Sequence, residues 1–283
     1  MIRTYYLLTK PGIIVGNLIT TGGAFALASK GHIDFSLFLV TLLGLGLVIA
    51  SACVFNNCID RENDKKMART KNRPLPKGLI SVRSALLFAT LLGFLGCTIL
   101  ALGTNSIALY TALMGFVVYV ILYSFSKVRT VYGTLIGSAS GAIPPVVGYT
   151  AVSGRFDLGA ALLFLILILW QMPHFYAIAM YRLEDYSAAS IPTLPAVRGS
   201  EVTKIRMILY VLAFTLALPL LVLTGHTGYI YLALATPLSV IWLWICYKGI
   251  KAEDDKIWAR SVFRFSLFVI VGLSGLMAFD PTS

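Results

Sequence analysis

The chain has 283 residues, of which 58% are hydrophobic and only 12% are charged, and its mean hydropathy is +0.84. This composition is too apolar for a water-soluble domain and is typical of a polytopic membrane protein. The net charge of +11 does not indicate a nucleic-acid-binding module, because the basic residues are not interleaved with aromatic residues on a polar surface. The four cysteines lack CxxC, CxxCH or paired-histidine spacing, which excludes the usual zinc, c-type haem and disulfide frameworks.

Nine apolar windows of about 20 residues follow in chain order, each long enough to cross a hydrocarbon core of about 30 Å. They cover residues 12–29, 35–57, 84–102, 106–126, 132–152, 158–181, 207–224, 229–247 and 262–279. We therefore expect an all-α fold, in which residues 1–283 form a single transmembrane domain with about nine helices around a central cavity. The N-terminus lacks the order of regions found in a cleavable signal peptide, so the first window is expected to remain as a span.

The basic residues are distributed unevenly between the two sides of this predicted bundle. Of the 23 lysines and arginines, all except Lys30 and Arg155 lie in the N-terminal segment or near the loops that follow even-numbered spans. The positive-inside rule assigns that side, with the N-terminus, to the cytoplasm and leaves the C-terminus outside. Topology alone thus accounts for most of the net charge.

The end of the second span carries polar residues at helical spacing. Steps of four residues advance a helix by about 6 Å and return to nearly the same angle, so Asn56, Asp60 and Asp64 are predicted to line one face. Amide and carboxylate oxygens are hard ligands suited to Mg²⁺, whose remaining positions phosphate oxygens can fill. The alternative is a solvated helix end, in which the two aspartates pair with Arg61 and the Lys65-Lys66 pair.

The segment RTKNRPLPKG follows this helix and places cations among turn-forming proline and glycine residues. Arginine and lysine side chains neutralise and orient phosphate groups. The segment is therefore a candidate diphosphate-binding loop, with Arg69, Lys71, Arg73 and Lys77 as its cations.

The fifth and sixth spans contain the remaining unusual features. Glycines and the pair Pro144-Pro145 predict an interrupted fifth helix, which either shapes a cavity or serves packing. In the sixth span, Gln171, His174, Tyr181 and Asp185 would share one face if the helix continues past its proline. His174 is the only histidine inside a span, and ionisable residues within a membrane are usually functional, so a functional role is favoured over a satisfied core imidazole.

Glycines in the spans are interpreted as sites of close helix packing. The loop KGIKAEDDKIWAR after the eighth span has adjacent carboxylates, which cannot share one helix face. We expect a solvated charged loop there, in which changing Asp254 or Asp255 has little effect.

Several of these segments resemble a known family. The arrangement NxxxDxxxD followed by RTxxRPLPxGxIS resembles the first signature of the intramembrane prenyltransferase superfamily. The segments KPGIIxGNLI, VFNN, WQMPHFYAIA and DYxxAxIPxLP are similar to the branch known as protohaem IX farnesyltransferases, or haem O synthases. The resemblance extends over nearly the whole chain.

The resemblance implies a bacterial-type inner-membrane enzyme that transfers farnesyl from farnesyl diphosphate to a vinyl group of haem b, giving haem O. It implies Mg²⁺ on Asn56, Asp60 and Asp64, with Lys127 and Arg129 as further neighbours of the diphosphate. Membrane lipid is an expected partner, nucleic acid is not, and contact with a haem-receiving oxidase or with haem A synthesis is a further expectation.

The second motif of the superfamily is usually a spaced DxxxD, whereas this chain has only adjacent Glu184 and Asp185. The resemblance makes His174, Tyr181, Arg182 and Asp185 the candidate acceptor site, with His174 ligating the haem iron or forming a hydrogen bond, and it puts a second Mg²⁺ in doubt. Two alternatives stay open from the residues: the same chemistry on a quinone precursor or chlorophyll-type acceptor, and an ion-coupled transporter. The transporter is the weaker one, because only one broken helix is predicted.

Overall fold

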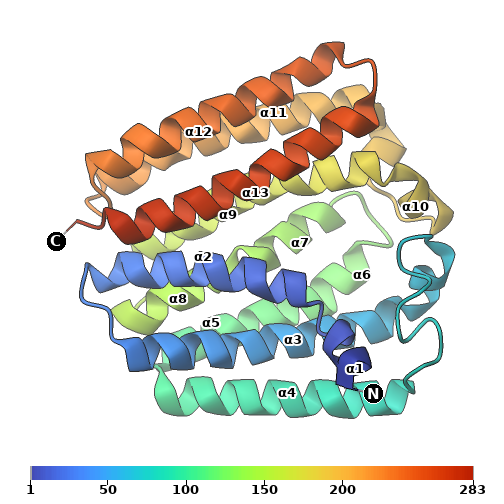
Figure 1. Cartoon of the computed structure of the whole chain (residues 1–283), viewed down its shortest axis with the longest axis horizontal. Helices are drawn as coiled ribbons and strands as arrows, with labels where there is room; N and C mark the ends of the chain where they lie inside the picture. The colour runs from blue at the N-terminus through green and yellow to red at the C-terminus, as the bar shows by residue number, and fades with distance from the viewer. Residues whose placement is uncertain (1, 283) are drawn as a thin grey trace.

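The computed structural model describes residues 2–282 and is all-helical (Figure 1). Nine of the described helical segments are long and apolar enough to span a membrane, which confirms the predicted number. The spans are α2 (Pro11–Ser29), α3 (Phe35–Lys66), α4 (Val82–Gly103), α5 (Ser106–Val117) continued by η1 (Val118–Tyr123) and α6 (Ser124–Ser126), α7 (Gly133–Gly141) with α8 (Ile143–Ser153), α9 (Leu158–Tyr181), α11 (Leu194–Leu223), α12 (Tyr229–Lys248) continued by η2 (Gly249–Lys251), and α13 (Asp255–Phe279). Two short helices, α1 (Ile2–Leu8) and α10 (Leu183–Ala188), complete the fold.

Several helices extend beyond the apolar windows that predicted them. α3 continues to Lys66, α11 already starts at Leu194, and α13 starts at Asp255. Hydropathy detects the part of a helix that lies in hydrocarbon, whereas the backbone hydrogen bonds continue into the charged residues beyond it. The polar motif at the end of the second span is therefore helical along its whole length.

The packing order brings the two ends of the chain together. α2 packs against α8 and α13, α3 against α4, and α9 against both α11 and α13, so the last helix closes against the first span (Figure 1). Glycines permit the closest approaches: a side chain at Gly23 would collide with the backbone of Ser274, and one at Gly96 with the carbonyl of Gly44. The predicted packing role of these glycines is confirmed, and the central cavity stays a prediction.

The fifth span is interrupted as its glycines and prolines predicted. α7 ends at Gly141 and α8 begins at Ile143, with Pro144 and Pro145 in the first turn of α8. Proline is tolerated there because the first N–H groups of a helix have no partner within it. The span is the most buried of the nine, so the break lies inside the protein.

The fourth span contains a π-type turn that the sequence analysis did not predict. Residues Val118–Tyr123 form a wide π-type turn, which holds one more residue than an ordinary helical turn. The short helix that follows carries Ser124 and leads directly to Lys127. Such turns are frequent at functional sites.

We call the end of the bundle where α3 and α9 end and α4 and α13 begin the basic end; it lies at the right of Figure 1, beside α1 and α10. The loop before α13 lies here, and Glu253 and Asp254 are exposed, as expected of a solvated charged loop, whereas Asp255 is half-buried and binds a neighbouring helix. Asp254 caps the first turn of α13. Oδ1 of Asp255 forms an ion pair with Nζ of the buried Lys204 of α11, at 2.8 Å. Adjacent carboxylates point in different directions, which allows one to cap a helix while the other binds its neighbour.

Candidate active site

Three polar side chains predicted to share a face of α3 are all buried at its basic end. Asn56 is 2% exposed, Asp60 8% and Asp64 2%. The alternative of a solvated helix end is therefore wrong for these aspartates. The nearby cations Arg61 and Lys65 instead bind the exposed Glu62 on the outer side of the helix.

Each aspartate is held by a cation from a different segment. Asp60 forms an ion pair with Lys127, which the wide turn of the fourth span brings to α3. Asp64 accepts a 2.9 Å hydrogen bond from Nη1 of Arg73. The same Nη1 lies 3.5 Å from Oδ1 of Asn57. Because a buried carboxylate needs compensation, these cations are the groups that allow the motif to sit inside the protein.

A third cation, Lys10, completes the group, although the sequence analysis assigned it only a topological role. Its Nζ donates to Oδ1 of Asn56 at 2.7 Å, across 46 residues of chain. Lys10 adopts a left-handed backbone conformation (φ 53°), which costs a residue with a side chain about 1–2 kcal/mol. Burial lowers the pKa of Lys10 to about 8, and the positive charges of Arg73 and Lys127 act in the same direction. Lys10 thus places a third positive charge beside the two buried carboxylates.

Asn56 is the point where the first, second and fourth spans meet. Its Nδ2 donates to Oγ of Ser124 at 3.1 Å, and the hydroxyl of Tyr119 lies 3.4 Å from its Oδ1. Tyr119 stacks on Tyr123, whose ring in turn lies 5.2 Å from Nζ of Lys127. Two tyrosines of the fourth span thus lie beside the motif and its cation Lys127.

The remaining predicted cations lie around this group without touching its carboxylates. Lys71 and Lys77 are exposed and form no side-chain hydrogen bond or ion pair with any residue from 2 to 282. Arg129 is exposed and lies over the ring of Phe125, at 5.4 Å. The diphosphate role of these three residues stays a prediction, whereas Arg73 and Lys127 are placed beside the motif.

The two motifs of the sequence meet at the basic end. The backbone N–H of Arg69 donates to Oδ1 of Asp185 at 3.4 Å, and Arg182 lies 3.8 Å from the same carboxylate. Tyr186 packs with Met67 in a small apolar cluster, and burial raises its pKa to about 12. These contacts hold the loop after α3 against α10.

The predicted helix does continue past Pro173 and carries Gln171, His174 and Tyr181, but it does not extend to Asp185. Arg182 leaves the helical conformation (φ −115°, ψ 20°), so α9 ends at Tyr181 and Asp185 lies on the separate helix α10. Tyr181 instead contacts α13, with its ring 5.6 Å from that of Phe263 and 5.9 Å from the guanidinium of Arg260.

His174 and Gln171 point to different neighbours. Nδ1 of His174 forms a 2.7 Å hydrogen bond with Oγ of Ser266 on α13, and its ring stacks on Trp170 at 4.8 Å. Gln171 lies against Gly141 of α7, where any side chain would displace the amide. Its buried Oε1 has no hydrogen-bond partner among residues 2–282. An unpaired buried acceptor costs about 1–3 kcal/mol, so it marks a place where a ligand could bind.

The donor set on α3 fits a hard cation that takes several ligands from its substrate. Residues 2–282 contain no cluster of three or more histidine, cysteine or acidic side chains, so a closed protein cage for a metal is absent from this part of the chain. Two carboxylates and one amide remain, all buried on one helix face. Mg²⁺ is commonly bound in this way, by one or two carboxylates together with phosphate oxygens and water.

The comparisons with known proteins concern the family of the chain. A sequence profile described as the UbiA prenyltransferase family matches residues 17–268. The protohaem IX farnesyltransferase of Cronobacter sakazakii is 56% identical over 281 residues, which cover 99% of this chain and 95% of that protein.

Solved structures extend the similarity to the fold. A digeranylgeranylglyceryl phosphate synthase superposes with a TM-score of 0.78 at 22% identity, covering 98% of this chain and 99% of the other. A UbiA homologue from Archaeoglobus fulgidus, bound to DMAPP and Mg²⁺, superposes with a TM-score of 0.71 at 15% identity, covering 94% and 99%. With its sequence matched along nearly its full length and its fold shared, the chain belongs to the UbiA prenyltransferase family.

Proposed function

We propose that this protein transfers the farnesyl group of farnesyl diphosphate to a vinyl group of protohaem IX, which gives haem O. The observation that carries this proposal is the 56% identity to a protohaem IX farnesyltransferase along 99% of the chain. The buried polar group at the basic end supplies chemistry that suits the donor. The acceptor is assigned from the similarity.

The donor diphosphate is proposed to lie against the α3 face. Asn56, Asp60 and Asp64 would hold Mg²⁺, which when bound supplies positive charge to the diphosphate oxygens. Lys10, Arg73 and Lys127 approach the same face from three directions, and cations of this kind orient and neutralise phosphate. When substrate and metal arrive, these cations can exchange their present partners for diphosphate oxygens.

These cations then favour cleavage of the allylic C–O bond. The departing diphosphate leaves with the electron pair, and Lys10, Arg73 and Lys127 stabilise its growing negative charge. The vinyl group attacks the allylic carbon to form the new C–C bond. Water adds to the resulting cation beside the porphyrin and loses a proton, which leaves the hydroxyl group of haem O. A shielded site limits the attack of water on the farnesyl cation itself.

The acceptor is proposed to lie beside the junction of the two motifs. Asp185 fixes the loop that follows the donor site, and the unpaired Oε1 of Gln171 offers a hydrogen-bond acceptor on α9. Since Nδ1 of His174 is bound to Ser266, any role of this histidine toward haem b falls to its Nε2. Transfer of haem O onward to an oxidase or to haem A synthesis is part of the same proposal.

We further propose that the basic end faces the cytoplasm and the C-terminus lies outside. All lysines and arginines except Lys30 and Arg155 belong to the basic end, as the positive-inside rule requires of a cytoplasmic side. Reporter fusions at the C-terminus and in the loop between α3 and α4 test this orientation. Cytoplasmic activity of a C-terminal reporter would contradict it.

The activity is tested by incubating the purified protein in lipid with farnesyl diphosphate, haem b and Mg²⁺. Chromatography and mass spectrometry should detect farnesylated, hydrated haem, and an Asp64→Asn variant made in parallel should give none. Prenylation of a quinone precursor with unmodified haem b would overturn the acceptor assignment while leaving the donor site intact.

A further inference from the structure

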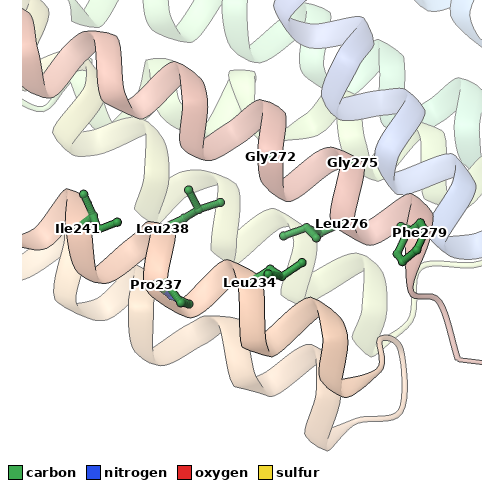
Figure 2. Close-up of a pocket in the computed structure, with 8 residues that line it drawn as sticks. All are labelled: Leu234, Pro237, Leu238, Ile241, Gly272, Gly275, Leu276 and Phe279. Atoms are coloured by element: carbon green, nitrogen blue, oxygen red, sulfur yellow. The ribbon is translucent and has the colours of Figure 1, made fainter.

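An open apolar groove runs along the outer side of α12 and α13, away from the candidate active site. Its part farther from the basic end has a volume of about 570 Å³. Figure 2 shows Leu234 and Leu238 of α12 on one wall of this part and Gly272 and Gly275 of α13 on the other. The α13 wall carries the side chains of Leu276 and Phe279, whereas its two glycines contribute none. A side chain at Gly275 would meet no atom within 4 Å, so the space beside it is open.

A second hollow of about 430 Å³ continues along the same pair of helices toward the basic end. Its lining includes Arg260, Ser261 and Arg264 of α13 together with Ile245 of α12. Along α13 the lining positions follow steps of three and four residues, which place them on one helix face. These positions are Ser261, Arg264, Phe268, Gly272, Gly275 and Phe279. The lining positions of the two hollows follow one another along this face of α13, so we describe the two hollows together as one groove, cationic near the basic end and apolar beyond it.

The two arginines at the entrance are exposed and have no acidic partner within ion-pair distance among residues 2–282. The guanidinium of Arg260 lies over the ring of Tyr181, at 5.9 Å, and that of Arg264 has no such contact. The acidic residues nearest in sequence are engaged elsewhere, since Asp254 caps α13 and Asp255 binds Lys204. The entrance is thus positively charged and available to an anion.

We propose that this groove binds an anionic phospholipid from the leaflet at the basic end, with its phosphate on Arg260 and Arg264 and one acyl chain beside Gly272 and Gly275. Guanidinium groups bind phosphate in a bidentate manner, and basic pockets between transmembrane helices recognise anionic head groups. The dimensions agree: Gly272 and Gly275 lie about 12 Å and about 16 Å along α13 from Arg264, close to the depth of about 15 Å of one leaflet. A second copy of the chain in the groove would bring like charges together, which disfavours it.

Native mass spectrometry of the purified full-length protein tests the proposal, with phosphatidylglycerol and phosphatidylcholine of identical acyl chains as probes. We expect phosphatidylglycerol to bind more tightly. The double change Arg260→Gln and Arg264→Gln should lower its affinity by roughly 25-fold, at roughly fivefold per arginine, and leave phosphatidylcholine little affected. Arg264→Gln alone should give the fivefold loss and avoids the contact with Tyr181.

A matched pair of glycine variants tests the contribution of the acyl-chain slot to lipid binding separately from that of the arginine charges. Gly275→Leu should weaken both lipids, because its Cβ would meet no protein atom within 4 Å and the rest of the side chain would occupy the acyl-chain slot. Gly16→Leu, at an exposed and equally open glycine of α2, should weaken neither. Arg83→Gln removes an exposed charge from the start of α4 and should also change nothing.

Three results would each overturn the proposal. They are equal affinity for the two head groups, unchanged phosphatidylglycerol binding after Arg264→Gln, and a Gly275→Leu variant that binds as the parent does. A protein dimer that disappears with Gly275→Leu would show that a second copy occupies the groove. Thermal unfolding of every variant shows whether the fold is retained.

Discussion

Lys10 and Lys30 form a matched pair through which the role of Lys10 can be tested by replacing each with glycine. Both flank α2, both adopt left-handed backbone conformations (φ 53° and 47°), and they lie at opposite ends of the bundle. Glycine relieves about 1–2 kcal/mol of backbone strain but loses about 0.5–1 kcal/mol more conformational entropy on folding. Each variant is therefore expected to gain roughly 0.5–1 kcal/mol in stability from the backbone.

Activity should separate the two variants. Lys10→Gly removes a cation proposed to bind the diphosphate, and a charged hydrogen bond contributes about 1.5–3 kcal/mol. We expect kcat/KM for farnesyl diphosphate to fall by about 10- to 150-fold in Lys10→Gly and to stay unchanged in Lys30→Gly. Lys10→Arg should recover part of the activity.

The assay measures initial rates at varied farnesyl diphosphate and saturating haem b, in parallel with thermal unfolding of the same preparations. Because the loss of the hydrogen bond between Lys10 and Asn56 offsets the gain from the backbone, the unfolding data show whether a loss of rate in Lys10→Gly reflects instability. An unchanged kcat/KM in Lys10→Gly, or an equal loss in both glycine variants, would refute a diphosphate-binding role for this lysine.

Four further substitutions and one removal of metal follow from the site and its surroundings. Asp60→Asn and Asp64→Asn should abolish turnover, while the control Glu62→Gln, which changes an exposed residue of the same helix, should retain it. Chelation of Mg²⁺ should reversibly stop turnover by the parent enzyme. Full activity in either asparagine variant would contradict the metal assignment. Ser266→Ala should lower the free energy of unfolding by about 1–3 kcal/mol, measured by thermal or denaturant unfolding in detergent, because the ring nitrogen of His174 loses its partner. Asp255→Asn should cost a similar amount, since the buried Lys204 keeps only Glu201, and a stability equal to that of the parent would restore the interpretation of a merely solvated loop.

The number of spans and the break between α7 and α8 could be predicted because each depends on local properties of the chain. Apolar length determines whether a segment can cross hydrocarbon, and Pro144 with its neighbouring glycines interrupts backbone hydrogen bonding wherever the segment lies. The grouping of Asn56, Asp60 and Asp64 was predictable for the same reason, since helical periodicity alone brings them together.

The partners of these residues could not be predicted, because they come from distant parts of the chain. Lys10 is 46 residues from Asn56, and Lys127 is 67 residues from Asp60. In a sequence, each lysine is also accounted for by membrane topology, so nothing separates an active-site cation from a topological one. The end of α9 at Arg182 was missed because no proline or glycine marks it, and it depends on the packing of α10 against the loop after α3.

The wide turn at Val118–Tyr123 sets the rotational phase of everything that follows it in the fourth span. Each residue of an ordinary helix turns the chain by about 100°. The extra residue in this turn therefore rotates the side chains that follow it, at the basic end, relative to those of the membrane half of the span. Deleting one residue here would yield a regular helix, equally apolar and equally able to cross the bilayer, but with Ser124 and Lys127 rotated away from Asn56 and Asp60. The insertion or deletion of even one residue in this segment is therefore expected to disrupt the site, although the amino-acid composition of the segment does not indicate this constraint.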